Sequence, residues 1–314
     1  MTRAGRNRYW REWVRMNDAP GRVAWVFPGQ GSQRVGMGQE LTADAEIAAI
    51  YEEADAALGF SLSNIIFSGP ADALQETSVQ QPAILLTSIA YLIALKKRGL
   101  LPDADYVAGH SLGEYSALVA AGALSLEDGL QLVRRRGELM QQHGAGVMAA
   151  ILGMDPKAVA AVARDTGVDV ANFNAPDQTT ISGSRDSVDK AMELAKERGA
   201  KRAILLPVSG AFHSSLMKGA EEGMRPYLMA VPMVPPEVPL VANVDAAILA
   251  ETDDIRQELI NQICGSVRWV DVVNTLSREG VTRYIEIGPG KVLAGLLGRS
   301  APGASVDTAE KLLT

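Results

Sequence analysis

A serine placed between a short apolar strand and a helix is the feature that most constrains this chain of 314 residues. Residues 106–108 predict a strand, residues 109–113 read GHSLG, and small or apolar residues follow at helical spacing. In such a turn the flanking glycines avoid clashes, and the helix amino terminus faces the hydroxyl. Ser111 is therefore a candidate nucleophile, with the N–H of Leu112 as a candidate oxyanion-hole donor. Because the pattern alone is only moderately specific, a purely structural turn is the alternative.

Strands and helices alternate on both sides of this turn. Residues 23–27 predict an apolar strand that runs into residues 28–33 (PGQGSQ), a loop whose tight path requires glycine. Late in the chain, a strand opens into GPG at 288–290 and a further helix. This order predicts an α/β domain. Its other predicted elements are helices at 44–58, 80–98 and 125–142 and a strand at 283–287.

The segment 146–209 has a different order of predicted elements. Six elements follow one another there as β-α-β-β-α-β. We expect a ferredoxin-like small domain at 146–209, inserted between the two parts of a large domain at 23–145 and 210–314. Its predicted strands lie near 147–152, 168–173, 179–182 and 203–208, with helices after residue 156 and at 185–198.

Composition excludes several classes of protein. The net charge of −7 offers no basic footprint for nucleic acid, and an anionic substrate would need a local positive group. A single cysteine, Cys264, makes neither an internal disulfide nor a metal cluster, so a cytoplasmic location is the default expectation. The longest apolar run, 83–95, is shorter than the ~20 residues of a membrane span and predicts a buried helix.

Residues 1–22 stand apart from the predicted domains. They carry five arginines between Arg3 and Arg15, together with Trp10 and Trp13, before the first clear strand. A short transit segment is one interpretation. An upstream extension, or a start codon placed too early with Met16 as the true start, is the preferred one. The extension is assigned no role.

A serine nucleophile needs a base, and the chain has three histidines. His110 is the direct neighbour of Ser111 on a sharp turn, so its side chain is expected to point elsewhere. His143 lies at a helix end, where an imidazole commonly caps the last carbonyls. Elimination favours His213, which follows the last strand of the small domain, where a cleft is expected to form. A satisfied core histidine is the alternative for this residue.

Five sequence blocks together resemble the malonyl-CoA:acyl carrier protein transacylases and, more broadly, the acyltransferase domains of fatty acid and polyketide synthases. The resemblance covers nearly everything from 23 to about 299. It implies an α/β-hydrolase-like large domain with an inserted ferredoxin-like small domain and an active site between them. The blocks are 27–33 (FPGQGSQ), 109–114 (GHSLGE), 136–137 (RG), 211–213 (AFH) and 286–290 (EIGPG), in the family's order.

The resemblance also implies roles for individual residues. Ser111 would be acylated, and His213 would act as general base and then as acid. The N–H groups of Gln30 and Leu112 would form the oxyanion hole. A backbone carbonyl at the position matching Gln262 would orient the base in place of an aspartate. The unusual tract at 264–266 (CGS) leaves open whether that position is displaced by one residue.

Arg136 matches the arginine that pairs with the free carboxylate of malonyl in this family, a task suited to a guanidinium fork. Helical periodicity places Arg135 away from the buried face of its helix. Arg134 and Arg136 flank that face equally, so periodicity does not choose between them. The resemblance favours Arg136.

Two further residues complete the predicted site. Asn172 is expected to line the cleft as in relatives, as is Asn174, although hydrogen bonding at a strand end would explain both equally well. The bulk of Phe212 is expected to crowd an α-substituted malonyl group. Malonyl is therefore predicted to be preferred over methylmalonyl, and over acetyl because of Arg136.

The predicted reaction is a ping-pong transfer. Ser111 takes malonyl from malonyl-CoA, and the phosphopantetheine thiol of an acyl carrier protein then accepts it. No metal and no redox cofactor are expected, and neither nucleic acid nor a membrane is an expected partner. A monomer is the simplest expectation, and the sequence does not separate a fatty acid role from a polyketide role.

Two rival functions share features of this sequence. A serine esterase or thioesterase shares the serine turn, but such enzymes place a histidine near the carboxyl terminus, and no histidine follows His213. A carrier-protein docking or scaffold module that only kept the fold is the second rival. The presence of Ser111, His213 and Arg136 together argues against it.

Overall fold

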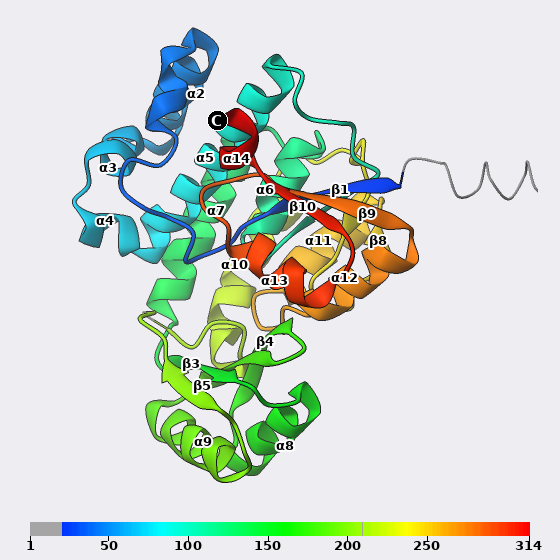
Figure 1. Ribbon diagram of the computed structural model, residues 1–314. Helices are drawn as coiled ribbons and strands as arrows, with labels where there is room; N and C mark the ends of the chain where they lie inside the picture. The colour runs from blue at the N-terminus through cyan, green and yellow to red at the C-terminus, as the bar shows by residue number, and fades with distance from the viewer. Residues whose placement is uncertain (1–20, 209) are drawn as a thin grey trace, which may run out of the picture.

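A computed structural model of the chain describes residues 21–208 and 210–314. The predicted extension at 1–22 therefore falls almost entirely outside the described residues. A six-stranded sheet organises the larger part, in the order β10-β9-β1-β2-β7-β8 (Figure 1). Its neighbours pair in parallel except β7 with β8. The strands are β1 (Arg22–Phe27), β2 (Tyr106–Gly109), β7 (Leu240–Val241), β8 (Ile248–Leu249), β9 (Val281–Glu286) and β10 (Ser305–Thr308).

A second, four-stranded sheet lies at the other end of the molecule in Figure 1, with α8 and α9 on its outer face. Its order, β4-β5-β3-β6, is fully antiparallel and is that of a ferredoxin-like βαββαβ unit. Every one of its strands lies within 146–209, and we propose those residues as the small domain. Its elements are β3 (Val147–Leu152), α8 (Pro156–Thr166), β4 (Asp169–Ala175), β5 (Gln178–Gly183), α9 (Arg185–Glu197) and β6 (Arg202–Leu205).

Helices cover the six-stranded sheet on both faces (Figure 1). The predicted mixed α/β class, with a large parallel sheet and a smaller ferredoxin-like part, is confirmed. The helices are α2 (Ala45–Leu58), α3 (Leu62–Ser68), α4 (Ala71–Gln75), α5 (Thr77–Lys97), α6 (Gly113–Ala120), α7 (Leu126–Gln142), α10 (Lys218–Ala230), α11 (Thr252–Asn261), α12 (Trp269–Arg278), α13 (Val292–Ser300) and α14 (Ala309–Leu313), with 3-10 turns η1 (Gln39–Ala43) and η2 (Ser215–Met217).

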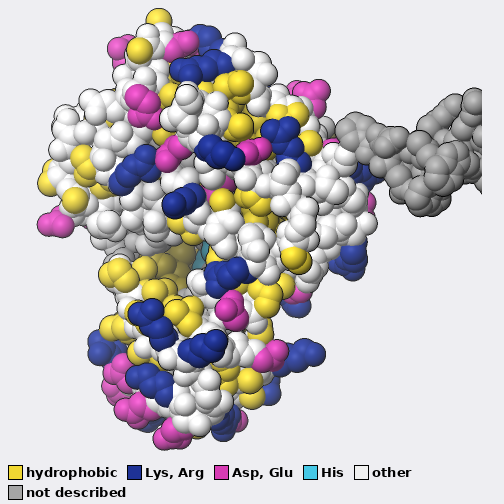
Figure 2. All heavy atoms as spheres, in the orientation of Figure 1, with side chains coloured by type: hydrophobic (Ala, Val, Ile, Leu, Met, Phe, Trp, Pro, Cys, Tyr) yellow, Lys and Arg dark blue, Asp and Glu magenta, His cyan; other side chains and the backbone are white. Residues whose placement is uncertain are grey.

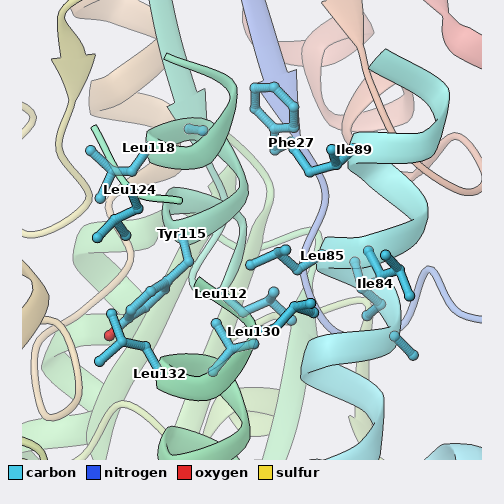
Figure 3. Close-up of a cluster of buried hydrophobic side chains, with 14 of the residues drawn as sticks. Phe27, Ile84, Leu85, Ile89, Leu112, Tyr115, Leu118, Leu124, Leu130 and Leu132 are labelled. Atoms are coloured by element: carbon cyan, nitrogen blue, oxygen red, sulfur yellow. The ribbon is translucent and has the colours of Figure 1, made fainter. Parts of the chain in front are cut away.

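Helix α5 is the central helix of the larger part. By length and composition alone it qualifies as a membrane span, yet 94% of its most apolar window is buried inside the protein. Figure 3 shows its side chain Leu85 pointing toward Leu112 and Leu130, which come from the serine turn and from α7, and Ile84 belongs to the same apolar cluster. The prediction of a buried helix here is confirmed. The serine turn is thereby anchored in the largest apolar cluster of the protein.

The start of α5 differs from the prediction, because the helix begins at Thr77 and carries Pro82 in its second turn. A proline has no N–H, so it cannot bond the carbonyl four residues earlier. That carbonyl, of Ser78, instead accepts a hydrogen bond from Arg134 Nη1 at 3.0 Å. Gly137 of α7 packs against this same turn, where a Cβ would lie 2.7 Å from Ser78 Cα. The close approach of α7 to α5 therefore depends on that glycine.

Candidate active site

The serine turn joins β2 to α6 at the carboxyl edge of the parallel sheet. Ser111 has a φ of 53°, a left-handed conformation that a non-glycine residue adopts only under constraint. The glycines on either side leave no room for a side chain. A Cβ on Gly109 would lie 1.9 Å from the Gly113 carbonyl carbon, and one on Gly113 would lie 2.2 Å from the Phe27 oxygen. The spacing of the motif is thus a steric requirement of the turn.

Asn243, two residues beyond β7, clamps this turn through its side chain. Its Oδ1 accepts the Ser111 N–H at 2.8 Å, and its Nδ2 donates to the Gly109 carbonyl at 2.7 Å. Sequence reasoning missed this residue. The available signal was its position just after a parallel strand, where functional side chains of α/β proteins gather. The strand itself is only two residues long and was not predicted.

His213 lies directly against the candidate nucleophile, with its Nε2 2.7 Å from Ser111 Oγ. Its Nδ1 faces two backbone carbonyls, of Gln262 at 2.9 Å and of Gly265 at 3.0 Å. Because a carbonyl only accepts, Nδ1 must carry the proton, which leaves Nε2 as an acceptor for the serine hydroxyl. His213 also has a positive φ, of 54°. The imidazole is oriented by main-chain atoms instead of by a carboxylate.

Arg136 is 1% exposed and touches the same serine. Its Nη2 donates to Ser111 Oγ at 3.0 Å and to Gln262 Oε1 at 2.9 Å, while its Nη1 donates to Gln81 Oε1 at 2.9 Å. The Gly137 contact described above sets this position, because it brings α7 against the start of α5. Arg134, which periodicity could not separate from Arg136, is instead held by the Ser78 carbonyl and by Glu138.

The charge on Arg136 has no ion-pair partner within 4 Å among residues 21–208 and 210–314. Its guanidinium also lies 5.8 Å from the centre of the Tyr115 ring. The carboxyl group of Glu114 acts on its charge only from beyond ion-pair distance, and that carboxyl group already accepts hydrogen bonds from Asn243 and Gln262. Burial lowers the pKa of Arg136 from its ordinary value, yet a guanidinium remains charged. A buried cation without a counter-ion is costly. Its presence beside a reactive hydroxyl favours an anionic ligand as the missing partner.

A pocket opens between the two sheets at these residues. Figure 2 shows a hollow between the larger and smaller parts of the molecule, bordered by hydrophobic side chains, with histidine atoms visible inside it. Both parts supply its walls. Besides Ser111, His213 and Arg136, the lining includes the predicted residues Gln30, Leu112, Phe212 and Asn172, together with Met140, Met148, Leu206, Val292 and Leu296.

The chain is similar in sequence to proteins of known activity. Residues 24–290 match the family described as the acyl transferase domain. The chain belongs to this acyl transferase family. The malonyl CoA-acyl carrier protein transacylase of Bacillus subtilis (strain 168) is 50% identical over 285 residues, which cover 88% of this chain and 89% of that protein. The resemblance that the five sequence blocks predict is confirmed.

Solved structures agree with this acyl transferase assignment. An acyl-carrier-protein S-malonyltransferase from Burkholderia pseudomallei 1710b is 44% identical and superposes with a TM-score of 0.90, covering 93% of this chain and 98% of its own. A malonyl-transacylase solved in complex with a type II PKS acyl-carrier protein is 37% identical, with a TM-score of 0.88 and coverages of 91% and 95%.

The remaining histidines of this acyltransferase are placed differently. His110 turns away from the nucleophile, and its Nε2 lies 2.8 Å from Asn174 Oδ1 across the pocket floor. Asn174 Nδ2 in turn donates to Thr180 Oγ1 at 3.3 Å. His143 forms the carboxyl-terminal cap of α7. Within the described part of the chain, no group of three His, Cys, Asp or Glu side chains is arranged to hold a metal ion.

The protonation state of His213 follows from its surroundings. Burial and, secondarily, the charge of Arg136 lower the pKa of His213 to about 3, compared with about 6.5 for an ordinary imidazole. The value of kcat/KM for malonyl-CoA should therefore stay constant as the pH is lowered well below 6.5, because His213 remains neutral there. The pH dependence of kcat/KM reports groups of the free enzyme. A bound carboxylate that offsets the charge of Arg136 should raise the pKa of His213 in the complex. The acid limb of kcat should then lie at a higher pH than the acid limb of kcat/KM. Initial rates across the acid range measure both limbs, and an acid limb of kcat/KM near pH 6.5 would contradict the assignment.

The same shift predicts a pH dependence of stability. Between the folded pKa of about 3 and the unfolded value of about 6.5, the unfolded chain binds the His213 proton and the folded chain does not. This contribution to the free energy of unfolding is full above the unfolded pKa and is lost as pH falls toward the folded pKa. Urea unfolding at neutral and at mildly acidic pH should therefore show a smaller loss for His213→Asn than for the unchanged protein. An equal loss in both proteins would place the acid sensitivity elsewhere.

Proposed function

We propose that this acyltransferase moves the malonyl group from malonyl-CoA to the phosphopantetheine thiol of an acyl carrier protein, through an ester on Ser111. The observation that carries the proposal is Arg136, a buried cation that has no ion-pair partner within the described residues and already donates to the nucleophile's own oxygen. A malonyl group has the free carboxylate that this cation lacks. The names of the relatives described above support the same substrate and carrier.

In the first half-reaction, Ser111 Oγ attacks the thioester carbonyl and its proton passes to His213 Nε2. The N–H groups of Gln30 and Leu112 would receive the resulting oxyanion, and among the described residues neither N–H has a backbone acceptor. Collapse of the intermediate breaks the C–S bond. The proton on His213 Nε2 then goes to the departing sulfur of coenzyme A, while the proton on Nδ1 stays on the nitrogen and continues to be donated to the two carbonyl oxygens.

In the second half-reaction, the thiol of the carrier protein gives its proton to His213 Nε2 and attacks the malonyl ester. The C–O bond to Ser111 breaks, and the serine oxygen recovers the proton from the imidazole. Water must be kept from the ester between the two steps. The apolar lining from Met140, Met148 and Leu206 supports that exclusion.

The other predicted residues receive roles consistent with their positions. Gln262 orients His213 through its carbonyl and contacts Arg136 through its side chain. Phe212 is 4% exposed in the pocket wall and would restrict substituents on the malonyl α-carbon. Asn172, also in the wall, would meet the acyl or pantetheine chain. A monomer in the cytoplasm, acting without metal or redox cofactor and without nucleic acid or membrane partners, remains part of this proposal.

Intact mass spectrometry tests the covalent step directly. Mixing the protein with malonyl-CoA should add the mass of one malonyl group, and Ser111→Ala should show no addition. Adding a phosphopantetheine-bearing acyl carrier protein should then return the mass of the enzyme to its starting value. An unchanged mass for the native protein would contradict the ester intermediate. Release of free malonate in place of transfer would favour the rival hydrolase.

A further inference from the structure

A pair of buried carboxyl groups lies beneath the serine turn. Glu114, the second residue of α6, is fully buried, and Glu258 of α11 is 6% exposed. Both point at one backbone group, because the N–H of Asn243 lies 2.7 Å from Glu114 Oε1 and 3.0 Å from Glu258 Oε1. The two carboxyl groups therefore converge on one N–H and interact electrostatically with each other. The reaction described above does not use either carboxyl group.

No cation forms an ion pair with either glutamate within the described ranges. The charged or titratable groups that face the pair are Arg136 from α7, Asp245 after β7 and Tyr115 from α6. Two carboxylates in contact in a buried site cannot both be ionised without a large penalty. Burial is the largest cause that raises the pKa of both groups. The negative charge of Glu258 adds to the rise for Glu114, and that of Asp245 adds to the rise for Glu258. The pair therefore keeps one proton at neutral pH.

Hydrogen-bond geometry places that proton. Both Glu114 oxygens accept N–H donors, Oε1 from Asn243 and Oε2 from Gln262 Nε2. Glu258 Oε1 accepts two, from Asn243 and from Val244 at 2.9 Å. Of the four oxygens, Glu258 Oε2 alone has no N–H donor among the described residues. It is therefore the oxygen that can carry the shared proton without facing an N–H donor.

We propose that Glu114 and Glu258 are positioning residues, which share one proton and hold Ser111 and Arg136 in register through Asn243 and Gln262. The proposal rests on the malonyl clamp assigned to Arg136. One relay runs through Asn243, whose backbone N–H is fixed by the pair while its side chain clamps the serine turn. The other runs through Gln262.

The Gln262 amide shows why the ionised Glu114 matters. Its Nε2 donates to Glu114 and to the Ser111 carbonyl, and its Oε1 accepts from Arg136. An amide can be reversed, but a carboxylate only accepts and a guanidinium only donates. Glu114 and Arg136 therefore lock the orientation of Gln262 from opposite sides. Loss of the shared proton at alkaline pH would add a second negative charge near Arg136 and weaken its attraction for a substrate carboxylate.

The two glutamates should respond differently to the same substitution. In Glu258→Gln, the new carbonyl keeps both N–H donors, and the new NH₂ takes the place of the protonated oxygen, which has no N–H donor. In Glu114→Gln, the new NH₂ group must face an N–H donor, either that of Asn243 or that of Gln262. This is unavoidable because the two residues donate to different oxygens of Glu114. We expect Glu258→Gln to keep kcat/KM for malonyl-CoA within about threefold at neutral pH, and Glu114→Gln to lose about tenfold or more, mainly in KM.

The decisive experiment is the pH profile of kcat/KM from about pH 6 to about pH 10 for the unchanged enzyme, Glu258→Gln, Glu114→Gln and Glu286→Gln. Glu286 is the matched control, since it is also fully buried but binds the start of α13. The alkaline limb should disappear in Glu258→Gln and persist in Glu286→Gln. A limb unchanged in Glu258→Gln, a limb abolished by Glu286→Gln, or equal losses in the two pair variants would overturn the proposal.

A readout without catalysis separates this proposal from the proposed function. Infrared spectroscopy at neutral pH should show a protonated buried carboxyl band that Glu258→Gln removes. If no malonyl ester forms on the unchanged protein, the proposed function fails while this band still tests the pair. Absence of a band sensitive to Glu258→Gln, in a protein that does form the ester, would refute the shared proton alone.

Discussion

Replacement of Ser111 by alanine is expected to lower malonyl transfer by about four orders of magnitude or more, the scale seen when a serine nucleophile is removed. The physical reason is that Ser111 Oγ receives Arg136 Nη2 and faces His213 Nε2, so both groups lose the atom on which they act. Transfer is measured as malonyl-carrier protein formed per unit time. Substantial residual transfer would exclude Ser111 as the nucleophile.

Two matched variants separate chemistry from folding. Ser116→Ala removes a buried hydroxyl of α6 that has no hydrogen-bond partner within the described residues, so activity and stability should be retained. Ser111→Gly should be as inactive as Ser111→Ala. It should also be more stable than Ser111→Ala by about 1 kcal/mol, because glycine relieves the φ of 53°. Equal stability of the two inactive variants would mean that the turn is not strained.

Local pattern was enough to find the serine turn because its requirements are local. The glycines at 109 and 113 are imposed by contacts within a few residues and by the adjacent β1 strand. The ferredoxin-like unit was predictable for the same reason, since its strands and helices are short, amphipathic and consecutive. His213 has no sequence pattern that marks it as a catalytic base. It was predicted by elimination among the three histidines.

Arg136 could not be identified from the local sequence pattern. Helical periodicity treats Arg134 and Arg136 alike, and only the packing of α7 on α5 distinguishes them. Pro82 frees the Ser78 carbonyl for Arg134, and Gly137 allows the approach that brings Arg136 to Gln81. That information is distributed over two helices about fifty residues apart. The resemblance supplied the choice that periodicity could not.

Asn243, Glu114 and Glu258 could not be assigned from sequence. Asn243 follows a two-residue strand after a proline-rich stretch, where pattern is weakest. Glu114 and Glu258 lie in helices, in which a glutamate is ordinarily a solvated residue. Their burial depends on α6 and α11 meeting at Asn243, more than one hundred residues after Glu114. Such contacts are visible only in the folded chain.

Replacement of Arg136 by alanine is expected to reduce kcat/KM for malonyl-CoA by about a hundredfold, since a charge-assisted contact to a desolvated carboxylate is lost. Transfer of acetyl, which has no carboxylate, should be affected much less. The measurement is the ratio of the two kcat/KM values on the same variant. Removing the charge should also raise the pKa of His213, because Arg136 is one of the causes that lower it. The acid limb should therefore move upward in Arg136→Ala.

Arg134→Ala is the matched control. It deletes a guanidinium from the same helix turn, but that guanidinium binds the Ser78 carbonyl and Glu138 and does not contact the nucleophile. It should leave the ratio of malonyl to acetyl transfer unchanged. A general disturbance of α7 would lower both substrates together, so the ratio isolates the charge from structural damage. If Arg136→Ala lowers malonyl and acetyl transfer equally, the clamp is wrong and the buried cation must serve the serine oxygen alone. A changed ratio with an unchanged Arg134→Ala control would instead assign carboxylate selection to this one side chain.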